Sequence, residues 1–217
     1  MYDYVAFDLD GTLTDPEAGL IAGFVYAFRK LNIDCTDRSA LRRFIGPPLF
    51  DEWQRVFGFT PDECDYAIRL FREYYNIYGW WDNRLYDGIP ELLSELKRRG
   101  KTLVLATSKP EDTAKSVLKL FGIDKYFDFI GGADGHKSRD KKHEVLEYSL
   151  SAVGCTTPEA RSRAIMIGDR LYDAEGAAAL GIASIGVLWG HGSAEEIASS
   201  GFTLTAEKPC DVAELLG

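Results

Sequence analysis

Two aspartates near the amino terminus, Asp8 and Asp10, directly follow a short apolar run. That run, Val5–Phe7, has the length and composition of a buried parallel strand. Two carboxylates beside such a strand are costly unless something compensates their charge, and a divalent cation is the obvious partner. Gly11 permits a sharp turn and offers its N–H to an anion. The stretch therefore indicates carboxylate, metal and phosphate chemistry at the carboxyl end of a strand.

The same stretch has a plainer interpretation, because Asp-x-Asp-Gly also occurs in hairpin turns and in calcium-binding loops. A calcium loop needs further oxygen ligands and a Glu about twelve positions along. Leu13 and Pro16 do not fit that pattern. A hairpin turn therefore remains an alternative interpretation of this stretch.

Polar residues also follow two later apolar runs. Thr107 and Ser108 come after residues 102–106, and Asp169 comes after residues 164–167, with Asp173 four positions on. Taken singly, Thr107, Ser108 and Asp169 could each simply cap a helix. The carboxyl ends of parallel strands meet at one edge of a sheet, however, and carboxylates gathered there repel one another unless a cation lies among them. Together the runs predict one site.

Strand and helix patterns alternate from residue 85 onward, which is typical of a doubly wound parallel sheet. The last part of the chain, residues 193–217, is interpreted as short helices and loops that cover a sheet edge. We therefore expect an α/β fold with strands at residues 102–106, 126–130, 164–167 and 183–188, and with helices at 88–99, 110–121, 142–153 and 172–180.

Residues 15–84 show helical periodicity and no strand pattern. Gly46, Pro47 and Pro48 interrupt the helical pattern, because proline cannot continue a helix. This block separates the first strand from the remaining ones. The sequence thus predicts an α/β core, residues 1–14 and 85–217, with an inserted all-helical domain, residues 15–84, whose helices span about 17–31, 38–44, 49–57 and 61–78.

The composition limits the classes of partner. A net charge of −9 and a pI near 4.9 argue against binding to a nucleic acid polymer. No apolar run approaches the roughly 18–20 residues of a membrane span, and the first strand begins too early for a signal peptide. The four scattered cysteines are expected to be reduced thiols. We expect a cytoplasmic protein, a monomer or weak homodimer, with no membrane partner.

Taken together, the motifs Asp8–Thr12, Thr107–Ser108 and Gly168–Asp173, with a lysine before the strand at 164–167, resemble those of the haloacid dehalogenase superfamily. The helical insertion resembles the type-one cap of its phosphoglycolate phosphatase-like branch. Residues 46–49 and 106–110 are similar to stretches common in that branch, and the resemblance covers nearly the whole chain. It implies a Rossmann-like core with a helical cap. It also implies a Mg²⁺-dependent phosphatase acting on a small phosphorylated metabolite, such as phosphoglycolate or a nucleoside monophosphate.

The resemblance also implies roles for the acidic residues. Asp8 is expected to attack phosphorus and form an aspartyl-phosphate. Asp10 is expected to protonate the leaving alcohol and later to deprotonate the attacking water. Asp8, Asp169 and the backbone carbonyl of Asp10 are expected to hold Mg²⁺, and Asp173 to support that shell directly or through water.

Other residues are expected to bind the phosphate group. The resemblance assigns this role to Thr107, with help from Gly11, Thr12 and Ser108. A lysine would balance the charge of the transferring group.

Three lysines of the predicted loop before residue 143 could supply that charge: Lys137, Lys141 and Lys142. Lys142 is chosen because Lys142-x-Glu144-Val145 resembles the usual start of the following helix in this family, and Lys141 is second.

Substrate selection is expected to lie in the inserted domain, where Arg42, Arg43, the loop 46–48 and Arg72 are the candidates. An arginine there could hold a second anionic group of the substrate. The plainer interpretation is a polar helix face.

Two other functions stay open. A sugar-phosphate mutase of the beta-phosphoglucomutase type shares every core residue named above. A non-catalytic phosphate-sensing module would keep the same pocket without turnover.

Overall fold

The structure, a computed structural model, describes residues 2–35, 37–134 and 138–217. The chain forms two compact units, one of residues Met1–Thr14 with Leu85–Gly217 and the other of residues Asp15–Arg84. Among the described residues, no helix combines the length and the apolar composition needed to span a bilayer.

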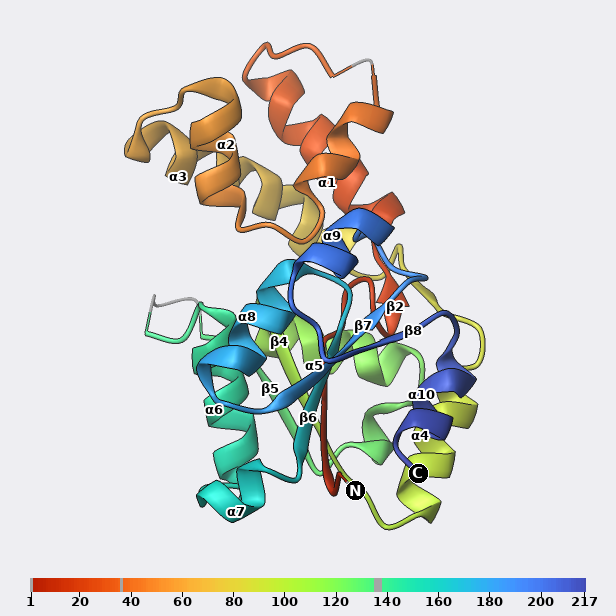
Figure 1. Cartoon of the computed structure of the whole chain (residues 1–217). Coiled ribbons are helices and arrows are strands. Elements are labelled where there is room, and N and C mark those ends of the chain that lie inside the picture. Colours follow the sequence, from red (N-terminus) through yellow and green to blue (C-terminus); the bar gives the residue numbers. More distant parts are fainter. Residues whose placement is uncertain (1, 36, 135–137) are drawn as a thin grey trace. The chain divides into compact units, whose positions relative to one another are not determined.

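A six-stranded parallel sheet forms the centre of the first unit (Figure 1). Numbered along the chain, its strands lie in the order 3-2-1-4-5-6, which is the Rossmann order. The predicted doubly wound parallel sheet is therefore confirmed. In spatial order the strands are β5 (Phe129–Ala133), β4 (Thr102–Pro110), β1 (Tyr4–Phe7), β6 (Ala164–Gly168), β7 (Ala183–Val187) and β8 (Leu204–Ala206).

The chain reverses its direction of travel across the sheet at β1. It passes from β1 to β4 and β5 on one side, and then returns to β6, β7 and β8 on the other. The carboxyl ends of β1 and β6 thus flank the switch point, where ligands bind in open α/β sheets. Phe7 pairs with Ile167 across these strands, and the Asp8 N–H donates to the Ile167 carbonyl at 2.9 Å.

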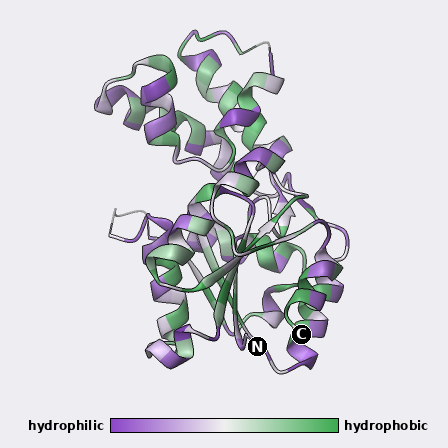
Figure 2. Ribbon diagram, in the orientation of Figure 1, coloured by the Kyte–Doolittle hydropathy of each residue, from purple (hydrophilic) through white to green (hydrophobic). Residues whose placement is uncertain are grey.

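Helices cover both faces of this sheet, and its strands are largely green in the hydropathy colouring of Figure 2. In Figure 1, α6 and α8 lie on one side and α4 and α10 on the other. Ala6, Val104 and Met166 share the buried face that packs with Val145 and Leu146 of α6. The helices of the unit are α4 (Ile89–Arg98), α5 (Glu111–Leu120), η3 (Asp124–Tyr126), α6 (Lys142–Ala152), α7 (Pro158–Arg161), α8 (Leu171–Ala179), α9 (Ala194–Ser199) and α10 (Pro209–Leu215).

Two predictions about this sheet are wrong in detail. The strand expected at residues 126–130 is β5, Phe129–Ala133, and it contains Gly131 and Gly132. A Cβ atom at Gly131 would lie 2.1 Å from the Ser149 Oγ, so this glycine serves close packing rather than a turn. The segment 193–217 contains β8, an edge strand that pairs with β7. With only Leu204–Ala206 in it, β8 is too short to show a strand periodicity.

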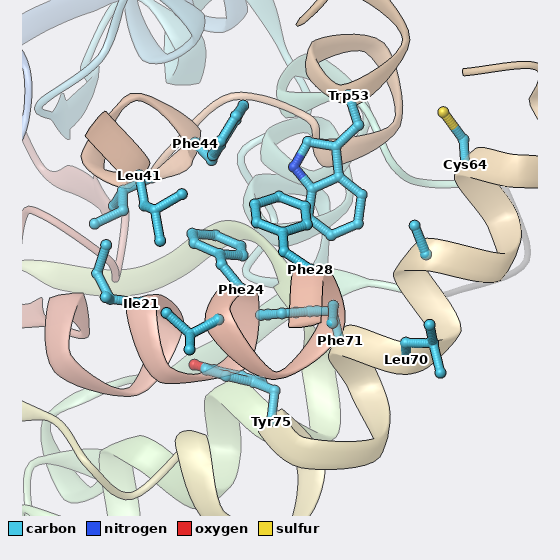
Figure 3. Packing of buried hydrophobic residues seen from close by; sticks show 14 residues of the cluster. Ile21, Phe24, Phe28, Leu41, Phe44, Trp53, Cys64, Leu70, Phe71 and Tyr75 are labelled. Carbon is cyan, nitrogen blue, oxygen red and sulfur yellow. The ribbon is translucent and has the colours of Figure 1, made fainter. Parts of the chain in front are cut away.

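The second unit is helical and has an aromatic core. Phe24, Phe28 and Trp53 are fully buried, and Phe71 stacks on Phe24 with ring centroids 5.2 Å apart (Figure 3). Short strands β2 (Thr14–Asp15) and β3 (Arg84–Leu85) pair where the chain enters and leaves the unit. The helices are α1 (Glu17–Lys30), η1 (Ser39–Phe44), α2 (Leu49–Phe57), α3 (Pro61–Tyr74) and η2, a π-helical turn (Tyr75–Gly79).

Candidate active site

Asp8 and Lys142 form a buried ion pair at the switch point of the sheet. Asp8 is the first residue after β1 and is 9% exposed, and the Lys142 Nζ lies 2.8 Å from its Oδ1. Lys142 is the first residue of α6, and its Nζ also donates to the Ala106 carbonyl at 3.1 Å. Burial alone would lower the pKa of Lys142. The carboxylates of Asp173 and Asp8 outweigh burial and hold that pKa above its ordinary value, so the ammonium is charged.

The other lysines of the preceding loop do not share this position. Lys141 is exposed, and its backbone N–H donates to Glu144 at 2.9 Å, which closes the first turn of α6. Lys137 lies outside the described residues. Of the two described lysines, Lys142 is the one whose ammonium contacts Asp8.

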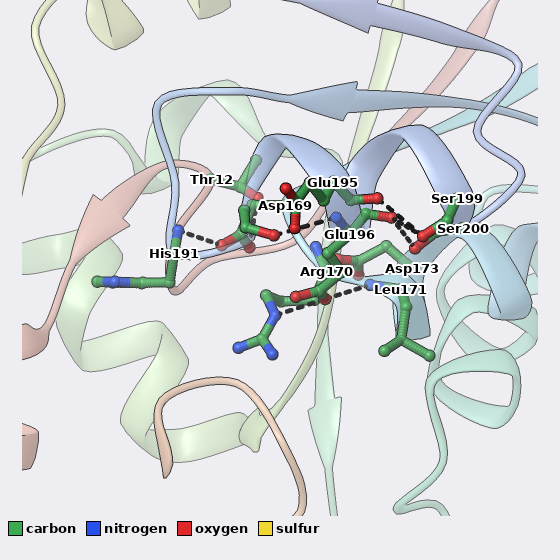
Figure 4. Close-up of polar contacts among 11 residues, drawn as sticks. Thr12, Asp169, Arg170, Leu171, Asp173, His191, Glu195, Glu196, Ser199 and Ser200 are labelled. Carbon is green, nitrogen blue, oxygen red and sulfur yellow. Dashed lines mark hydrogen bonds and ion pairs between the residues drawn. The ribbon is translucent and has the colours of Figure 1, made fainter. Parts of the chain in front are cut away.

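Asp169 is a fully buried carboxylate directly after β6. Its Oδ2 accepts a hydrogen bond from the His191 N–H at 2.7 Å, and its Oδ1 lies 3.5 Å from the Thr12 hydroxyl (Figure 4). Burial, followed by the charges of Asp173 and Asp8, raises the pKa of Asp169 to about 7. This carboxyl is thus held in a position where its own charge is disfavoured.

Asp173 lies in the first turn of α8 and is 1% exposed. Its Oδ1 lies 2.8 Å from the Lys142 Nζ, and its Oδ2 accepts from the Arg170 N–H at 3.1 Å. Burial raises the pKa of Asp173 to about 6, with Lys142 opposing the shift and Asp8 adding to it. Asp173 therefore links the start of α8 to the ion pair on Asp8.

The three carboxylates fit a divalent cation. Each of Asp8, Asp169 and Asp173 offers an oxygen atom, and these atoms lie within 4.8 Å of one another. Three buried carboxylates face one ammonium from Lys142, so negative charge remains in excess. A hard cation that prefers oxygen ligands would balance this charge. The prediction of an acidic metal site at this sheet edge thus agrees with the arrangement.

Asp10 is paired with a lysine that the sequence analysis did not select. The Lys109 Nζ lies 2.5 Å from the Asp10 Oδ2, and its side chain is only 5% exposed. Lys109 lies in β4 two residues after Thr107, and both side chains are buried while Ser108 between them is exposed. The Thr107 hydroxyl accepts from the Lys109 N–H at 3.3 Å. Side chains two positions apart on a strand lie on the same face, so the position of Lys109 two residues after Thr107 was the signal in the sequence.

Gly11 and Thr12 lie in the turn after β1, next to Asp169, and the phosphate-binding role of Thr12 stays a prediction. The Gly11 N–H donates to the Thr14 carbonyl at 2.7 Å, so it is engaged within the turn rather than offered to an anion. Gly11 has φ +85°, and a Cβ atom there would lie 2.1 Å from the Asp169 Oδ2. Thr12 is fully buried against Asp169. Both residues therefore shape the surroundings of Asp169 in this structure.

The loop after β7 encloses Asp169 from the other side. The Trp189 indole donates to the Thr12 carbonyl at 3.0 Å. A Cβ atom at Gly192 would lie 2.0 Å from the Asp169 carbonyl oxygen, so only glycine lets this loop approach so closely. Sequence reasoning missed this loop; its signal was the Trp-Gly-x-Gly pattern after the strand.

Helix α9 fixes the segment that follows Asp169. The Glu196 Oε1 accepts hydrogen bonds from the Arg170 Nε at 2.8 Å and from the Leu171 N–H at 3.1 Å (Figure 4). Asp169 is thus held by the β1 turn, the loop after β7 and the segment bound to α9.

A family model for haloacid dehalogenase-like hydrolases matches residues 5–187. The chain belongs to the haloacid dehalogenase-like hydrolase family. The predicted family, the predicted fold and the prediction of an enzyme of the hydrolase class are confirmed.

Three proteins that are similar to this chain have different described activities. A 5'-nucleotidase from Pseudomonas aeruginosa is 40% identical over 196 residues, covering 90% of this chain and 87% of that protein. The tyrosine-protein kinase PtkA from Mycobacterium tuberculosis is 38% identical over 200 residues, covering 92% of this chain and 67% of that protein. A crystal structure described as a predicted phosphatase from Clostridium acetobutylicum has a TM-score of 0.94 and 37% identity, covering 100% of this chain and 98% of that one.

The arginines predicted to select the substrate of this haloacid dehalogenase-like hydrolase lie in the helical unit. Arg43 and Arg72 are exposed, and the Arg43 guanidinium lies 5.8 Å from the centre of the Phe44 ring. Arg42 pairs with Glu17 at 2.7 Å. The binding roles of Arg43 and Arg72 stay predictions.

Proposed function

We propose that this haloacid dehalogenase-like hydrolase is a Mg²⁺-dependent phosphatase that hydrolyses a small-molecule phosphate monoester through an aspartyl-phosphate on Asp8. The observation that supports this most is the buried Asp8–Lys142 pair at the switch point, with Asp10 two residues beyond Asp8. A carboxylate at the end of β1 is available as a nucleophile, and an ammonium beside it suits a transferring phosphoryl group.

The first chemical step forms a bond between an Asp8 oxygen and phosphorus while the bond from phosphorus to the leaving oxygen breaks. Asp10 gives its proton to that leaving oxygen, which avoids release of an alkoxide. In the second step water attacks the aspartyl-phosphate. Asp10 takes a proton from that water, the bond between Asp8 and phosphorus breaks, and inorganic phosphate leaves. In both steps Asp8 binds or releases the phosphoryl group and Asp10 transfers the proton.

Charge on the phosphoryl oxygens is the main difficulty in both steps. Lys142, held by Asp8 and Asp173, keeps a positive charge next to the nucleophile. The Thr107 hydroxyl and the backbone around Ser108 would donate to the phosphoryl oxygens from the end of β4. We propose that Asp8, Asp169 and the Asp10 carbonyl hold Mg²⁺, with Asp173 in support. When bound, the cation would supply further neutralisation of charge.

The substrate is proposed to be a small metabolite that carries a second polar or anionic group. The similar protein from Pseudomonas aeruginosa is named a 5'-nucleotidase, which makes nucleoside monophosphates the first class to test. Phosphoglycolate is the second, because a carboxylate would suit Arg43 or Arg72 of the helical unit.

A screen of phosphorylated metabolites tests this function. The purified protein should release inorganic phosphate from at least one nucleoside monophosphate or phosphoglycolate with Mg²⁺ present and should stop when EDTA is added. Release that continues in EDTA would contradict the metal requirement. A protein that releases no phosphate from any compound, including p-nitrophenyl phosphate, would instead be a phosphate-sensing module.

The acceptor of the phosphoryl group separates hydrolysis from transfer. Phosphoryl transfer to an acceptor other than water is the alternative to hydrolysis. A similar protein is named a tyrosine-protein kinase, and a sugar-phosphate mutase would share the core residues proposed here. Product analysis with hexose 1-phosphates and with a tyrosine peptide distinguishes these outcomes. A phosphatase yields one inorganic phosphate for each ester consumed, whereas a transferase yields a new phosphate ester.

A further inference from the structure

Lys109 is a buried lysine to which the proposed chemistry gives no role. Its Nζ lies 2.5 Å from the Asp10 Oδ2. The Lys109 side chain is 5% exposed and the Asp10 side chain 20% exposed. Removing an ammonium so far from water is costly, and the carboxylate contact offsets only part of that cost. If this side chain only had to fill space in the core, an apolar residue would stabilise the fold more than a buried lysine does.

The pairing of β4 with β5 is irregular next to Lys109, as in a β-bulge. Thr107 pairs with Gly132 and Pro110 pairs with Ala133, so Ser108 and Lys109 have no counterparts on β5. Such an insertion re-aims the side chains of the bulged strand. A Cβ atom at Gly132 would lie 2.7 Å from the Lys109 carbonyl oxygen and 2.6 Å from the Glu111 Cα, so the bulge requires glycine on the neighbouring strand. Two local features thus combine to place this one ammonium.

The two oxygens of Asp10 have different surroundings. Oδ2 is held by Lys109. Oδ1 is buried and accepts no hydrogen bond from the described residues. A carboxylate that must pass a proton to and from substrate needs one oxygen free for that purpose and a fixed direction in which it points. The contact with Lys109 holds one oxygen and so meets the second requirement.

We propose that Lys109 is a positioning residue for Asp10: by holding Oδ2 it fixes the orientation in which the Asp10 carboxyl group gives and takes the proton. This inference rests on the proposed phosphatase activity. In the first step the proton moves from the Asp10 carboxyl group to the leaving oxygen as the bond between phosphorus and that oxygen breaks. In the second step a water proton returns to the Asp10 carboxylate as the water oxygen bonds to phosphorus and the bond between Asp8 and phosphorus breaks. Lys109 exchanges no proton and forms no bond to phosphorus.

Two substrates with different leaving groups test this role. An alkyl phosphate needs a proton on its leaving oxygen, whereas p-nitrophenyl phosphate has a leaving group that departs with little help. Lys109→Met keeps the length of the side chain and removes its charge. We expect it to lower kcat on the alkyl ester about 10²-fold, which is the lower end of what general acid catalysis contributes, and to lower kcat on the aryl ester several times less. KM should change little on either substrate.

A double variant separates positioning from other roles. Because Lys109 acts through Asp10, adding Lys109→Met to Asp10→Asn should lower kcat on the alkyl ester no further than Asp10→Asn does. Additive losses would overturn the inference while leaving the phosphatase intact, as would a rise in KM with unchanged kcat, which would make Lys109 a substrate contact. Equal losses on both substrates would also overturn it, because they would indicate a general structural defect.

Two further variants complete the design. Lys115→Met removes a partly exposed lysine that pairs with Glu111 at 2.6 Å on the helix after β4, and it should leave the ratio of the two activities unchanged. Gly132→Ala should disturb the bulge and reproduce the selective loss on the alkyl ester even though Lys109 is present. If the wild-type protein released no phosphate from either ester, the proposed function would fail and this inference with it. Selective loss in Lys109→Met but not in Gly132→Ala would overturn the part assigned to the bulge.

Discussion

The two units of this chain bury different kinds of side chain. The helical unit, residues 15–84, buries a continuous aromatic cluster that includes Phe24, Phe28, Trp53 and Phe71. Among the buried polar and charged residues of the described chain, Asp15 alone belongs to that unit. The α/β unit buries the others, which are Asp8, Thr12, Thr14, Lys101, Thr107, Lys109, Lys142, Ser149, Asp169, Asp173 and Ser184.

The aromatic core of the helical unit contributes to stability, whereas the buried charges of the α/β unit are expected to perform chemistry. Burying aromatic surface stabilises a fold, because each large side chain removes much apolar area from water. Burying carboxylates and ammonium groups costs free energy unless each finds a partner. The buried ion pairs of the α/β unit, Lys142 with Asp8 and Asp173 and Lys109 with Asp10, lie at one sheet edge, beside Asp169. The α/β unit therefore buries these energetically costly charges at the edge where the chemistry is expected.

The largest effect is expected from Asp8→Asn. The amide keeps the shape of the side chain but is a poor nucleophile, so turnover should fall by about 10⁴-fold or more. The circular dichroism spectrum should stay unchanged. Asp51→Asn, at an acidic residue in the first turn of α2, is the matched control and should keep full activity. If Asp8→Asn retained ~10% of wild-type turnover, the nucleophile assignment would be wrong.

The helical unit should respond to a core substitution in stability instead. Trp53 is fully buried and packs on Phe24, Phe28 and Phe71. Trp53→Ala should lower the free energy of unfolding by about 3–5 kcal/mol, measured by urea denaturation. Trp81, which is 54% exposed, is the control, and Trp81→Ala should cost far less. Equal losses from the two variants would show that the aromatic cluster does not determine the stability of this unit.

The sequence predicted which strands carry the site because Asp8, Thr107 and Asp169 each follow an apolar run. The order of the runs, joined by helices, also predicted the parallel sheet. The displaced start of β5 has a physical cause, since Gly131 and Gly132 signal a turn by type but are needed for close packing. The three residues of β8 take their strand conformation from pairing with β7, which no local pattern reports.

Within the site, the residues that were missed act through contacts between distant parts of the chain. Lys109 reaches Asp10 across 99 positions, next to a register shift between β4 and β5. Gly192 approaches Asp169 across the sheet edge through a missing Cβ atom. Residue type and spacing predict which groups could do chemistry, but the partner of each group depends on backbone detail of this kind.

The buried carboxylates also predict how stability depends on pH without metal. The pKa values of Asp169, about 7, and Asp173, about 6, lie above the ordinary value of 3.8. Between pH 3.8 and about 7 the folded protein therefore keeps protons that the unfolded chain has released, and raising the pH favours unfolding. The contribution of these groups is complete below pH 3.8 and is lost as the pH rises through 6 and 7.

Thermal unfolding in EDTA and in Mg²⁺ measures this dependence. Because the cation binds the ionised carboxylates, Mg²⁺ should raise Tm more at pH 7.5 than at pH 5. A hundredfold excess over Kd corresponds to about 2.7 kcal/mol of added stability. Asp169→Asn, compared with wild type at each pH, isolates the site from groups such as Glu95, whose pKa of about 2 acts in the opposite direction. A Mg²⁺ effect of equal size at both pH values would contradict the proposed binding site.

The smallest effect is expected from an ion pair on the surface of the helical unit. Arg55 and Glu52 form two hydrogen bonds one turn apart on α2, at 3.1 and 2.7 Å, and the Arg55 side chain is 60% exposed. Water screens the guanidinium, so Arg55→Gln should change the free energy of unfolding by only about 0.5 kcal/mol in urea. The buried Lys142 pairs have the same chemistry without that screening, and Lys142→Met should cost several times more because Asp8 and Asp173 would be left unpaired. If the two substitutions cost the same, exposure to water would not explain the difference between the buried pairs at the site and this exposed pair of the helical unit.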